Sequence, residues 1–339
     1  MKLNFTIFFI FTLLLSGCFP AKDPNSKKEF LLQGRTMGTT YNIKVVGIEE
    51  DLKLEQLQKE IDATLVQVNN EMSTYQPDSE ITMFNESQGF EPVKISNGFR
   101  VVLSEALRIG ELTDGMLDIT IGPLVNLWGF GPDYQPERVP TDVEQAEARK
   151  KVGLSKIILN DTGLSKTQPD VYVDLSTIAK GYGVDVVADL ISSKGINDYL
   201  VEIGGEMRLS GFKDNGTLWH IAVEKPISTE RSVHQVVVPK NNALATSGDY
   251  RNYIEVDGQR YSHIIDPKTG SPINHKLVSV TVVHPSSMTA DGLSTAIMVM
   301  GPEQGLAFAQ KHDLAAMLIV KTDNGFEEIN TVKFMSYLK

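Results

Sequence analysis

The chain has 339 residues, of which 41% are hydrophobic and 22% are charged, and its formal net charge is −11 at pH 7. This length and hydrophobic content suffice for a large core, enclosed by one large domain or by two closely packed subdomains. An acidic chain without basic runs is a poor partner for nucleic acid, so we exclude that class of ligand. A phosphate-bearing ligand would need a local device, such as a metal ion, a helix N-terminus or a single lysine.

Residues 1–17 have the layout of an export signal. Lys2 supplies a positive charge, and the run from Phe5 to Leu15 is apolar except for threonines. A transmembrane helix needs roughly 20 apolar residues, so this run is too short to cross a bilayer.

The predicted signal ends in Leu15-Ser16-Gly17-Cys18, which resembles the lipobox of bacterial lipoproteins. In that class the signal is cut before the cysteine, which then carries the lipid. The alternative is an ordinary cleaved signal with an incidental cysteine. We favour lipidation because Cys18 is the only cysteine in the chain and stands where a lipobox needs it. Residues 18–29 are polar and contain proline, as in a tether, and the folded domain is expected at 30–339.

Helices and strands are mixed along the chain without strict alternation, which predicts an α+β fold rather than a doubly wound sheet. Apolar periodicity and capping residues predict helices at 52–72, 97–113, 141–153, 176–195 and 286–301. Runs of β-branched residues predict strands at 41–46, 155–159, 171–175, 199–205, 219–224, 233–238, 253–256, 277–283 and 315–320. A tight hairpin turn is expected at Asp257-Gly258. The glycine spacing does not match a dinucleotide-binding fingerprint.

The stretch from Val173 to Asp185 favours an anion site. A strand is expected to end at Asp174-Leu175, and a helix opening at Ser176 with small residues would leave backbone N–H groups free for a pyrophosphate. Lys180, one turn further, would add a positive charge. The structural alternative is that Asp174 and Ser176 only cap the helix and that Lys180 is solvated.

Asp291 and Thr295 lie four residues apart in an otherwise small and apolar helix, so their side chains share one face. A carboxylate and a hydroxyl are hard oxygen donors that suit Mg²⁺, whose shell phosphates and water would complete. The alternative is that Asp291 caps the helix and Thr295 bonds back to a carbonyl. Tyr75, Asp118 and His263 likewise have ordinary interpretations: a half-buried turn tyrosine, a strand-end residue that caps the next helix, and a strand residue that faces solvent.

Eight short motifs stand in order along the chain. They are Met37-Gly38-Thr39-Thr40, Ser73-Thr74-Tyr75, Gly122-Pro123-Leu124 with Leu127 to Gly131, Asp174 to Tyr182, Gly204-Gly205-Glu206, Ser247-Gly248-Asp249-Tyr250, His263 to Gly270, and Ala290-Asp291 with Thr295. Together they resemble the pattern of the ApbE family of flavin transferases. The resemblance covers about residues 30–320 and departs at Leu117, where the family usually has phenylalanine.

This resemblance implies an enzyme that uses Mg²⁺ to transfer FMN from FAD to a threonine or serine hydroxyl of an acceptor protein, with AMP leaving. It implies a flavin site in a cleft between subdomains, with the carbonyl of Ala179, Asp291 and Thr295 as metal ligands. His263 corresponds to the proposed general base, and Lys180 would stabilise charge on the phosphates. The implied FAD contacts are Met37, Tyr75, Met116, Leu117, Asp118, Ser176, Lys180, Tyr182 and Ile265.

The resemblance also implies an acceptor that is a subunit of a membrane redox complex, and a lipid-anchored enzyme in the bacterial cell envelope that faces the periplasm. Two alternatives stay open, and the first of them would use the same site. One is a Mg²⁺-dependent FAD pyrophosphatase that forms FMN and AMP. The other is a flavin-binding lipoprotein without turnover.

Overall fold

A computed structural model describes residues 27–339 except 49–50, 88–89, 133–137, 227–231 and 250–251. The predicted signal, Cys18 and most of the predicted tether therefore lie outside the described residues. Lys27 already pairs with Asp198 at 2.6 Å, and the first strand begins at Glu29, so contact with the domain starts slightly before the predicted boundary. None of the helices in the described ranges is both long and apolar enough to cross a membrane.

One sheet of eight strands runs through the structure, and all its described pairings are antiparallel. The antiparallel sheet and the helices packed on it confirm the predicted α+β fold. Of the two predicted arrangements, one large domain is correct, because a single sheet runs through the structure. In spatial order the strands are β1 (Glu29–Thr36), β2 (Thr39–Val46), β5 (Tyr199–Ile203), β6 (Glu206–Ser210), β9 (Ala243–Gly248), β12 (Leu277–His284), β13 (Ala315–Thr322) and β14 (Gly325–Asn330).

Three hairpins accompany the sheet: β3 (Ile157–Asn160) with β4 (Gly163–Lys166), β7 (Ile221–Glu224) with β8 (Val233–Val237), and β10 (Tyr253–Val256) with β11 (Gln259–Ser262). Asp257 and Gly258 join β10 to β11 with φ of 51° and 76°, which confirms the predicted tight turn.

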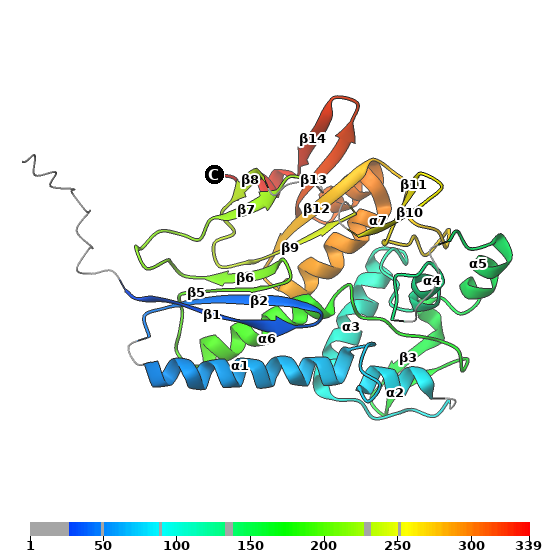
Figure 1. The fold of residues 1–339 in the computed structure, drawn as a ribbon, viewed down its shortest axis with the longest axis horizontal. Coiled ribbons are helices and arrows are strands. Elements are labelled where there is room, and N and C mark those ends of the chain that lie inside the picture. The colour runs from blue at the N-terminus through cyan, green and yellow to red at the C-terminus, as the bar shows by residue number, and fades with distance from the viewer. Residues whose placement is uncertain (1–26, 49–50, 88–89, 133–137, 227–231, 250–251) are drawn as a thin grey trace, which may run out of the picture.

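The longer helices α1, α6 and α7 cover one face of the sheet (Figure 1). The α1 and α6 helices pack beneath β1, β2 and β5, while α7 packs along β9 and β12. The helices of the described residues are α1 (Asp51–Met72), α2 (Glu80–Glu86), α3 (Asn97–Leu112), α4 (Gly122–Leu127), α5 (Asp142–Arg149), α6 (Ala179–Ser193), α7 (Ser287–Lys311) and α8 (Val332–Met335).

Both faces of the central strands are buried, because side chains alternate between two apolar layers. On β12, Val282 faces the layer of α7, whereas Val283 faces a second layer that contains Trp219 from the segment before β7 and Phe334 from α8. This double coverage explains why β12 carries apolar residues on both of its faces, and the sequence prediction located this strand correctly.

The predicted strand at 171–175 is wrong. The amide of Val173 donates to the side chain of Asn85 at 2.7 Å, and the amide of Asp174 donates to the carbonyl of Ile119 at 2.8 Å. The backbone of this segment is therefore satisfied by a side chain and a loop instead of by a strand ladder.

Helix ends also differ from the predictions. Ser176 lies in a turn, and α6 begins three residues later at Ala179. The capping box of Thr141 and Glu144 at the start of α5 is confirmed, although that helix ends at Arg149, before the predicted limit. The predicted helix at 286–301 continues to Lys311 beyond a break at Gly301, where φ is 79°.

The α6 and α7 helices cross so closely that a side chain at Gly181 has no room. A Cβ atom there would lie 2.4 Å from the carbonyl oxygen of Ser287 and 2.7 Å from the Cα atom of Met288. Both are backbone atoms, so the helices would have to separate. A Cβ atom at Gly183 would come too close only to the flexible end of Met37, at 2.8 Å, and would make an ordinary contact with Ile203 at 3.5 Å.

We therefore expect Gly181→Ala to lower the free energy of unfolding by about 1–3 kcal/mol, despite the better helix propensity of alanine. Gly183→Ala, in the same helix, should cost less because the Met37 side chain can move. Urea unfolding followed by circular dichroism measures both. Equal effects of the two substitutions would contradict the close crossing.

Candidate active site

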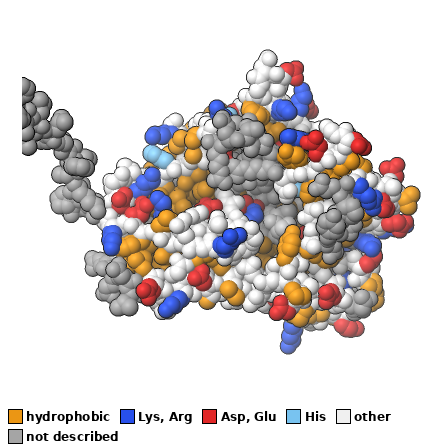
Figure 2. All heavy atoms as spheres, viewed as in Figure 1, with side chains coloured by type: hydrophobic (Ala, Val, Ile, Leu, Met, Phe, Trp, Pro, Cys, Tyr) orange, Lys and Arg blue, Asp and Glu red, His pale blue; other side chains and the backbone are white. Residues whose placement is uncertain are grey.

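The site is a cavity of about 820 Å³ where α6, α7 and β9 meet the turn after α1 and the loop before α4. This volume lies within the usual range of small-molecule sites. On the face of the molecule shown in Figure 2, basic and acidic side chains are interspersed, without a large field of one sign.

Asp185 of α6 fixes the start of α7 beside the cavity. Its carboxylate accepts hydrogen bonds from the hydroxyl of Ser286 at 2.7 Å and from the amides of Ser287 and Met288, each at 3.0 Å. Ser286 is the N-cap of α7, with its side chain accepting from the amide of Thr289. The alternative that Asp291 caps this helix is therefore wrong, and Asp291 is free for another role.

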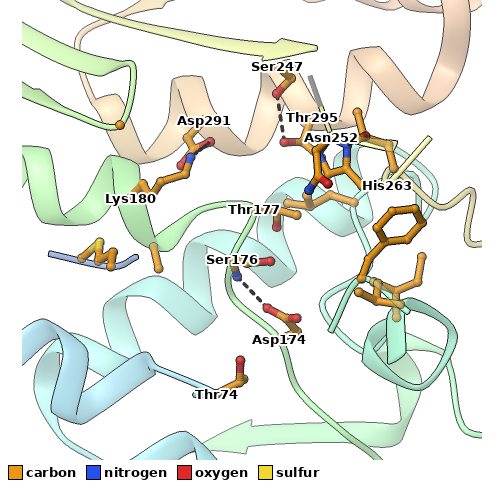
Figure 3. A pocket seen from close by; sticks show the side chains of 18 of the residues that line it. Thr74, Asp174, Ser176, Thr177, Lys180, Ser247, Asn252, His263, Asp291 and Thr295 are labelled. Atoms are coloured by element: carbon orange, nitrogen blue, oxygen red, sulfur yellow. Dashed lines mark hydrogen bonds and ion pairs between the residues drawn. The ribbon is translucent and has the colours of Figure 1, made fainter. Parts of the chain in front are cut away.

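Three charged side chains from three elements meet in the cavity (Figure 3 shows Lys180 beside Asp291). The Nζ atom of Lys180 lies 2.7 Å from Oε1 of Glu206 and 3.8 Å from Oδ1 of Asp291. The other Asp291 oxygen accepts from the amide of Gly181 at 3.0 Å. Glu206 and Asp291 are only 4% and 3% exposed, so two buried carboxylates share one ammonium group.

Burial and mutual repulsion shift the ionisation of this cluster. Burial raises the pKa of Asp291 to about 7, with the Lys180 charge opposing and the Glu206 charge adding to the shift. Burial also raises the pKa of Glu206, against the attraction of Lys180. For Lys180 burial opposes the charge, but the two carboxylates outweigh it and hold the pKa above its ordinary value.

Thr295 lies one turn after Asp291, and both side chains line the cavity. The hydroxyl of Thr295 lies 3.1 Å from that of Ser247 (Figure 3). The Ser247 hydroxyl also lies 2.8 Å from the hydroxyl of Ser294. The Thr295 hydroxyl is thus held by Ser247 of β9. The alternative interpretation, in which it bonds back to a carbonyl of its own helix, is not what the structure shows. Ala179, the first residue of α6, also lines the cavity.

The prediction that backbone N–H groups at a helix start near Ser176 bind an anion is wrong. The Ser176 amide donates to Asp174 at 2.8 Å, the Ala179 amide to Leu175 at 2.8 Å, and the Gly181 amide to Asp291. These donors are therefore not free for a phosphate. The Thr177 hydroxyl is buried and has no hydrogen-bond partner among the described residues, and Lys180 remains as the cation of this segment.

His263 lines the cavity beside Asn252 (Figure 3), so the solvent-facing interpretation is wrong. Its Nδ1 atom lies 2.9 Å from the carbonyl oxygen of Asn252, which can only accept a hydrogen bond. The ring proton of neutral His263 is therefore on Nδ1, and Nε2 carries a lone pair that no other described residue occupies. Burial lowers the pKa of His263, and the nearby Lys180 charge lowers it further, so the neutral form prevails at pH 7.

Met37 and Tyr75 reach the cavity from turns. Met37 occupies the tip of the β1–β2 hairpin with φ of 48°, an uncommon conformation for a residue other than glycine. Tyr75 follows α1 and is 70% exposed at the cavity mouth, which confirms the predicted turn position but not the half-buried alternative. An exposed ring at a cavity mouth can stack on a planar ligand.

The structure brings together every predicted site residue except Tyr182 and Cys18, the latter outside the described residues. Tyr182 packs between α1 and α3, where its hydroxyl lies next to Gly98 and Glu71. Leu117 is 2% exposed and packs against Gly292, so its side chain supports the wall. The predicted residues that line the cavity are Met37, Tyr75, Met116, Leu117, Asp118, Ser176, Ala179, Lys180, His263, Ile265, Asp291 and Thr295.

No role was predicted from the sequence for three residues that make contacts in this site: Glu206, Ser247 and Asn252. Glu206 and Ser247 lie in the motifs Gly204-Gly205-Glu206 and Ser247 to Tyr250, so their positions were marked although their contacts were not. Asn252 acts through its backbone carbonyl, which no side-chain pattern can reveal.

Known proteins of one family match this chain. The sequence model of the ApbE family matches residues 37–318. The FAD:protein FMN transferase of Vibrio cholerae is 51% identical over 326 residues, which is 96% of each chain. The structure of Flavin Transferase ApbE from Vibrio cholerae gives a TM-score of 0.85 at 51% identity, over 92% of this chain and 100% of that one. The apo Pseudomonas stutzeri flavinyl transferase ApbE gives 0.86 at 38% identity, over 94% and 99%.

Because Lys180 is the common partner of two buried carboxylates, Lys180→Met should destabilise the protein. We expect the free energy of unfolding to fall by about 3 kcal/mol. This is the low end of the cost of breaking a buried ion pair, because the lysine side chain is 30% exposed. Lys194→Met in the C-cap of the same helix, where the lysine pairs with Glu60 at 44% exposure, should cost less than about 1 kcal/mol. Urea unfolding in EDTA measures both, and similar losses would contradict the charge cluster.

Proposed function

The chain belongs to the ApbE family, and on that basis we propose that it transfers the FMN half of FAD to a hydroxyl group of an acceptor protein. The observation that carries the proposal is the single cavity in which Lys180, Asp291 and His263 meet. A cation, a carboxylate and a base in one cavity suit phosphoryl transfer from a pyrophosphate.

In the proposed reaction, the oxygen of an acceptor threonine or serine bonds to the FMN-side phosphorus of FAD. The P–O bond to the bridging oxygen breaks, and AMP leaves with the electron pair. The hydroxyl proton passes to Nε2 of His263, the ring nitrogen that the Asn252 contact leaves free. An ammonium group has three donors, so Lys180 can hold Glu206 and still stabilise charge on the phosphate oxygens.

A divalent cation, Mg²⁺, is part of the proposal. Asp291, the hydroxyl of Thr295 and the carbonyl of Ala179 would hold it. The charge balance supports this assignment, because the two buried carboxylates, when both are ionised, exceed the one ammonium group by a negative charge that a cation would offset. The described residues contain no cluster of three or more His, Cys, Asp or Glu side chains, so a hydroxyl and a carbonyl would complete the protein ligands. When bound, the ion supplies charge stabilisation on phosphate oxygens.

The flavin ring would lie at the cavity mouth against Tyr75, with Met37, Met116 and Ile265 as apolar neighbours. This arrangement would hold one end of FAD while its pyrophosphate reacts beside Lys180.

The names of the relatives favour transfer over hydrolysis of FAD by water, since the 51% identical Vibrio cholerae protein is an FAD:protein FMN transferase. The orientation of His263 favours an enzyme over a flavin carrier, because a carrier has no use for a free imidazole nitrogen at the pyrophosphate. The acceptor we propose is a flavin-carrying subunit of a membrane redox complex. A lipid on Cys18 would keep the enzyme at the membrane of the cell envelope, facing the periplasm and beside such acceptors.

The reaction class is tested by incubating the full-length chain in detergent with FAD and Mg²⁺, with and without an acceptor protein. We expect covalent flavin on the acceptor, with one AMP released per flavin attached, and little AMP without acceptor. Rapid formation of AMP and free FMN without acceptor would favour the pyrophosphatase. No AMP under either condition would favour the carrier.

Asp291→Ala should abolish this Mg²⁺-dependent turnover, a loss of at least about 100-fold, because the only acidic metal ligand is removed. The thermal unfolding temperature should show a folded protein. Asp189→Ala removes an exposed carboxylate from α6 and should leave turnover unchanged. Unchanged activity of Asp291→Ala would refute the metal assignment.

The pH profile of kcat/KM tests the base. At saturating Mg²⁺, which keeps the Asp291 carboxylate ionised, the acid limb should report His263. Because burial lowers the pKa of His263 below its ordinary value, the active neutral form should persist at pH 6.5, and activity should fall only at lower pH. In His263→Ala this acid limb should disappear, and transfer should slow by about 100-fold or more, with FAD binding changed much less. An equal loss of binding and transfer, or an unchanged acid limb, would argue against a base role.

A further inference from the structure

Lys180 lies near two buried carboxylates but is within hydrogen-bond distance of only one, Glu206. Its Nζ atom makes an ion pair with Glu206 at 2.7 Å, whereas its 3.8 Å separation from Asp291 is beyond hydrogen-bond distance. The second oxygen of Glu206 is buried without a hydrogen-bond partner among the described residues. Lys180 is therefore the group that compensates the charge of Glu206.

The turn before β6 holds Glu206 in this position. Gly204 and Gly205 have φ of 58° and 107°, which favour glycine, and Glu206 follows them directly in register with Ile203 of β5. A Cβ atom at Gly204 would lie 2.8 Å from Thr39 and 3.5 Å from the Lys180 side chain. The turn thus packs against the stem of the lysine whose ammonium group Glu206 binds.

The Asp291 carboxylate is held differently. The Gly181 amide occupies one oxygen, and the other, Oδ1, faces Lys180 at the longer distance. An ammonium group in direct contact with Oδ1 would compete with any cation for that oxygen. Lysine has a flexible stem, so only a stronger partner elsewhere can keep its ammonium group away.

We propose that Glu206 is a positioning residue that holds the Lys180 ammonium group off Asp291 and so keeps the Asp291 carboxylate available to a divalent cation. This inference rests on the cation site of the proposed function. Glu206 acts through Lys180 and does not itself contact the cation or the reacting atoms. Its effect should therefore depend on the presence of the lysine.

The test is Mn²⁺ binding to the full-length chain in detergent without FAD, measured from the electron paramagnetic resonance signal of free Mn²⁺. In Glu206→Gln the side chain loses its charge, Lys180 moves onto Asp291, and the Kd for Mn²⁺ should rise about tenfold or more. Glu202→Gln is the matched control. Glu202 lies on β5, and its carboxylate accepts from Asn42 and Gly205 rather than from Lys180.

Glu202→Gln removes the same charge near the cavity and should change the Kd by less than about twofold. Equal effects of the two substitutions would overturn the proposal, because they would show a general loss of negative charge. Circular dichroism confirms that each variant is folded.

A double-mutant comparison tests the dependence on lysine. In a Lys180→Met background, Glu206→Gln should change the Kd by less than about twofold, because the competing ammonium group is gone. An undiminished effect in that background would overturn the proposal; if Lys180→Met does not fold, the comparison with Glu202→Gln decides. Failure of the unmodified chain to bind Mn²⁺, or equal binding by Asp291→Ala, would overturn the cation site and this inference with it.

Discussion

The close crossing of α6 and α7 at Gly181 is the constraint on which the site depends. Only a residue without a side chain allows the backbones to meet at Ser287. The Asp185 carboxylate then fixes the start of α7 by accepting hydrogen bonds from the Ser286 hydroxyl and the Ser287 amide. The crossing places Lys180 of one helix beside Asp291 of the other. The two groups are 111 positions apart in the sequence, and the packing of the helices, rather than any local motif, makes them neighbours.

The second determinant is electrostatic. One ammonium group serves two carboxylates that are nearly excluded from water, and burial makes an uncompensated charge costly. Such a cluster is a poor choice for stability alone, since apolar residues would pack there at lower cost. It is well suited to a ligand that brings both charges: a cation for the carboxylates and a pyrophosphate for the ammonium group.

Local chemistry made part of this site predictable. The i, i+4 spacing of Asp291 and Thr295 correctly placed both on one face of a helix, and the Asp257-Gly258 turn was identified from its residue types. The segment 171–175 was misread because its β-branched residues are typical of strands. Its amides are satisfied by Asn85 and the loop at Ile119, which are distant in sequence. The Asn252 carbonyl and the Glu206 ion pair likewise depend on tertiary placement, which periodicity does not encode.

The most direct test of the central claim is a crystal structure of the protein with FAD and Mn²⁺, in which anomalous scattering locates the ion. We predict one strong anomalous peak in contact with Asp291 and Thr295 and with the pyrophosphate of FAD, with Lys180 still bonded to Glu206. A peak elsewhere, or FAD bound with its pyrophosphate away from Lys180, would contradict the account.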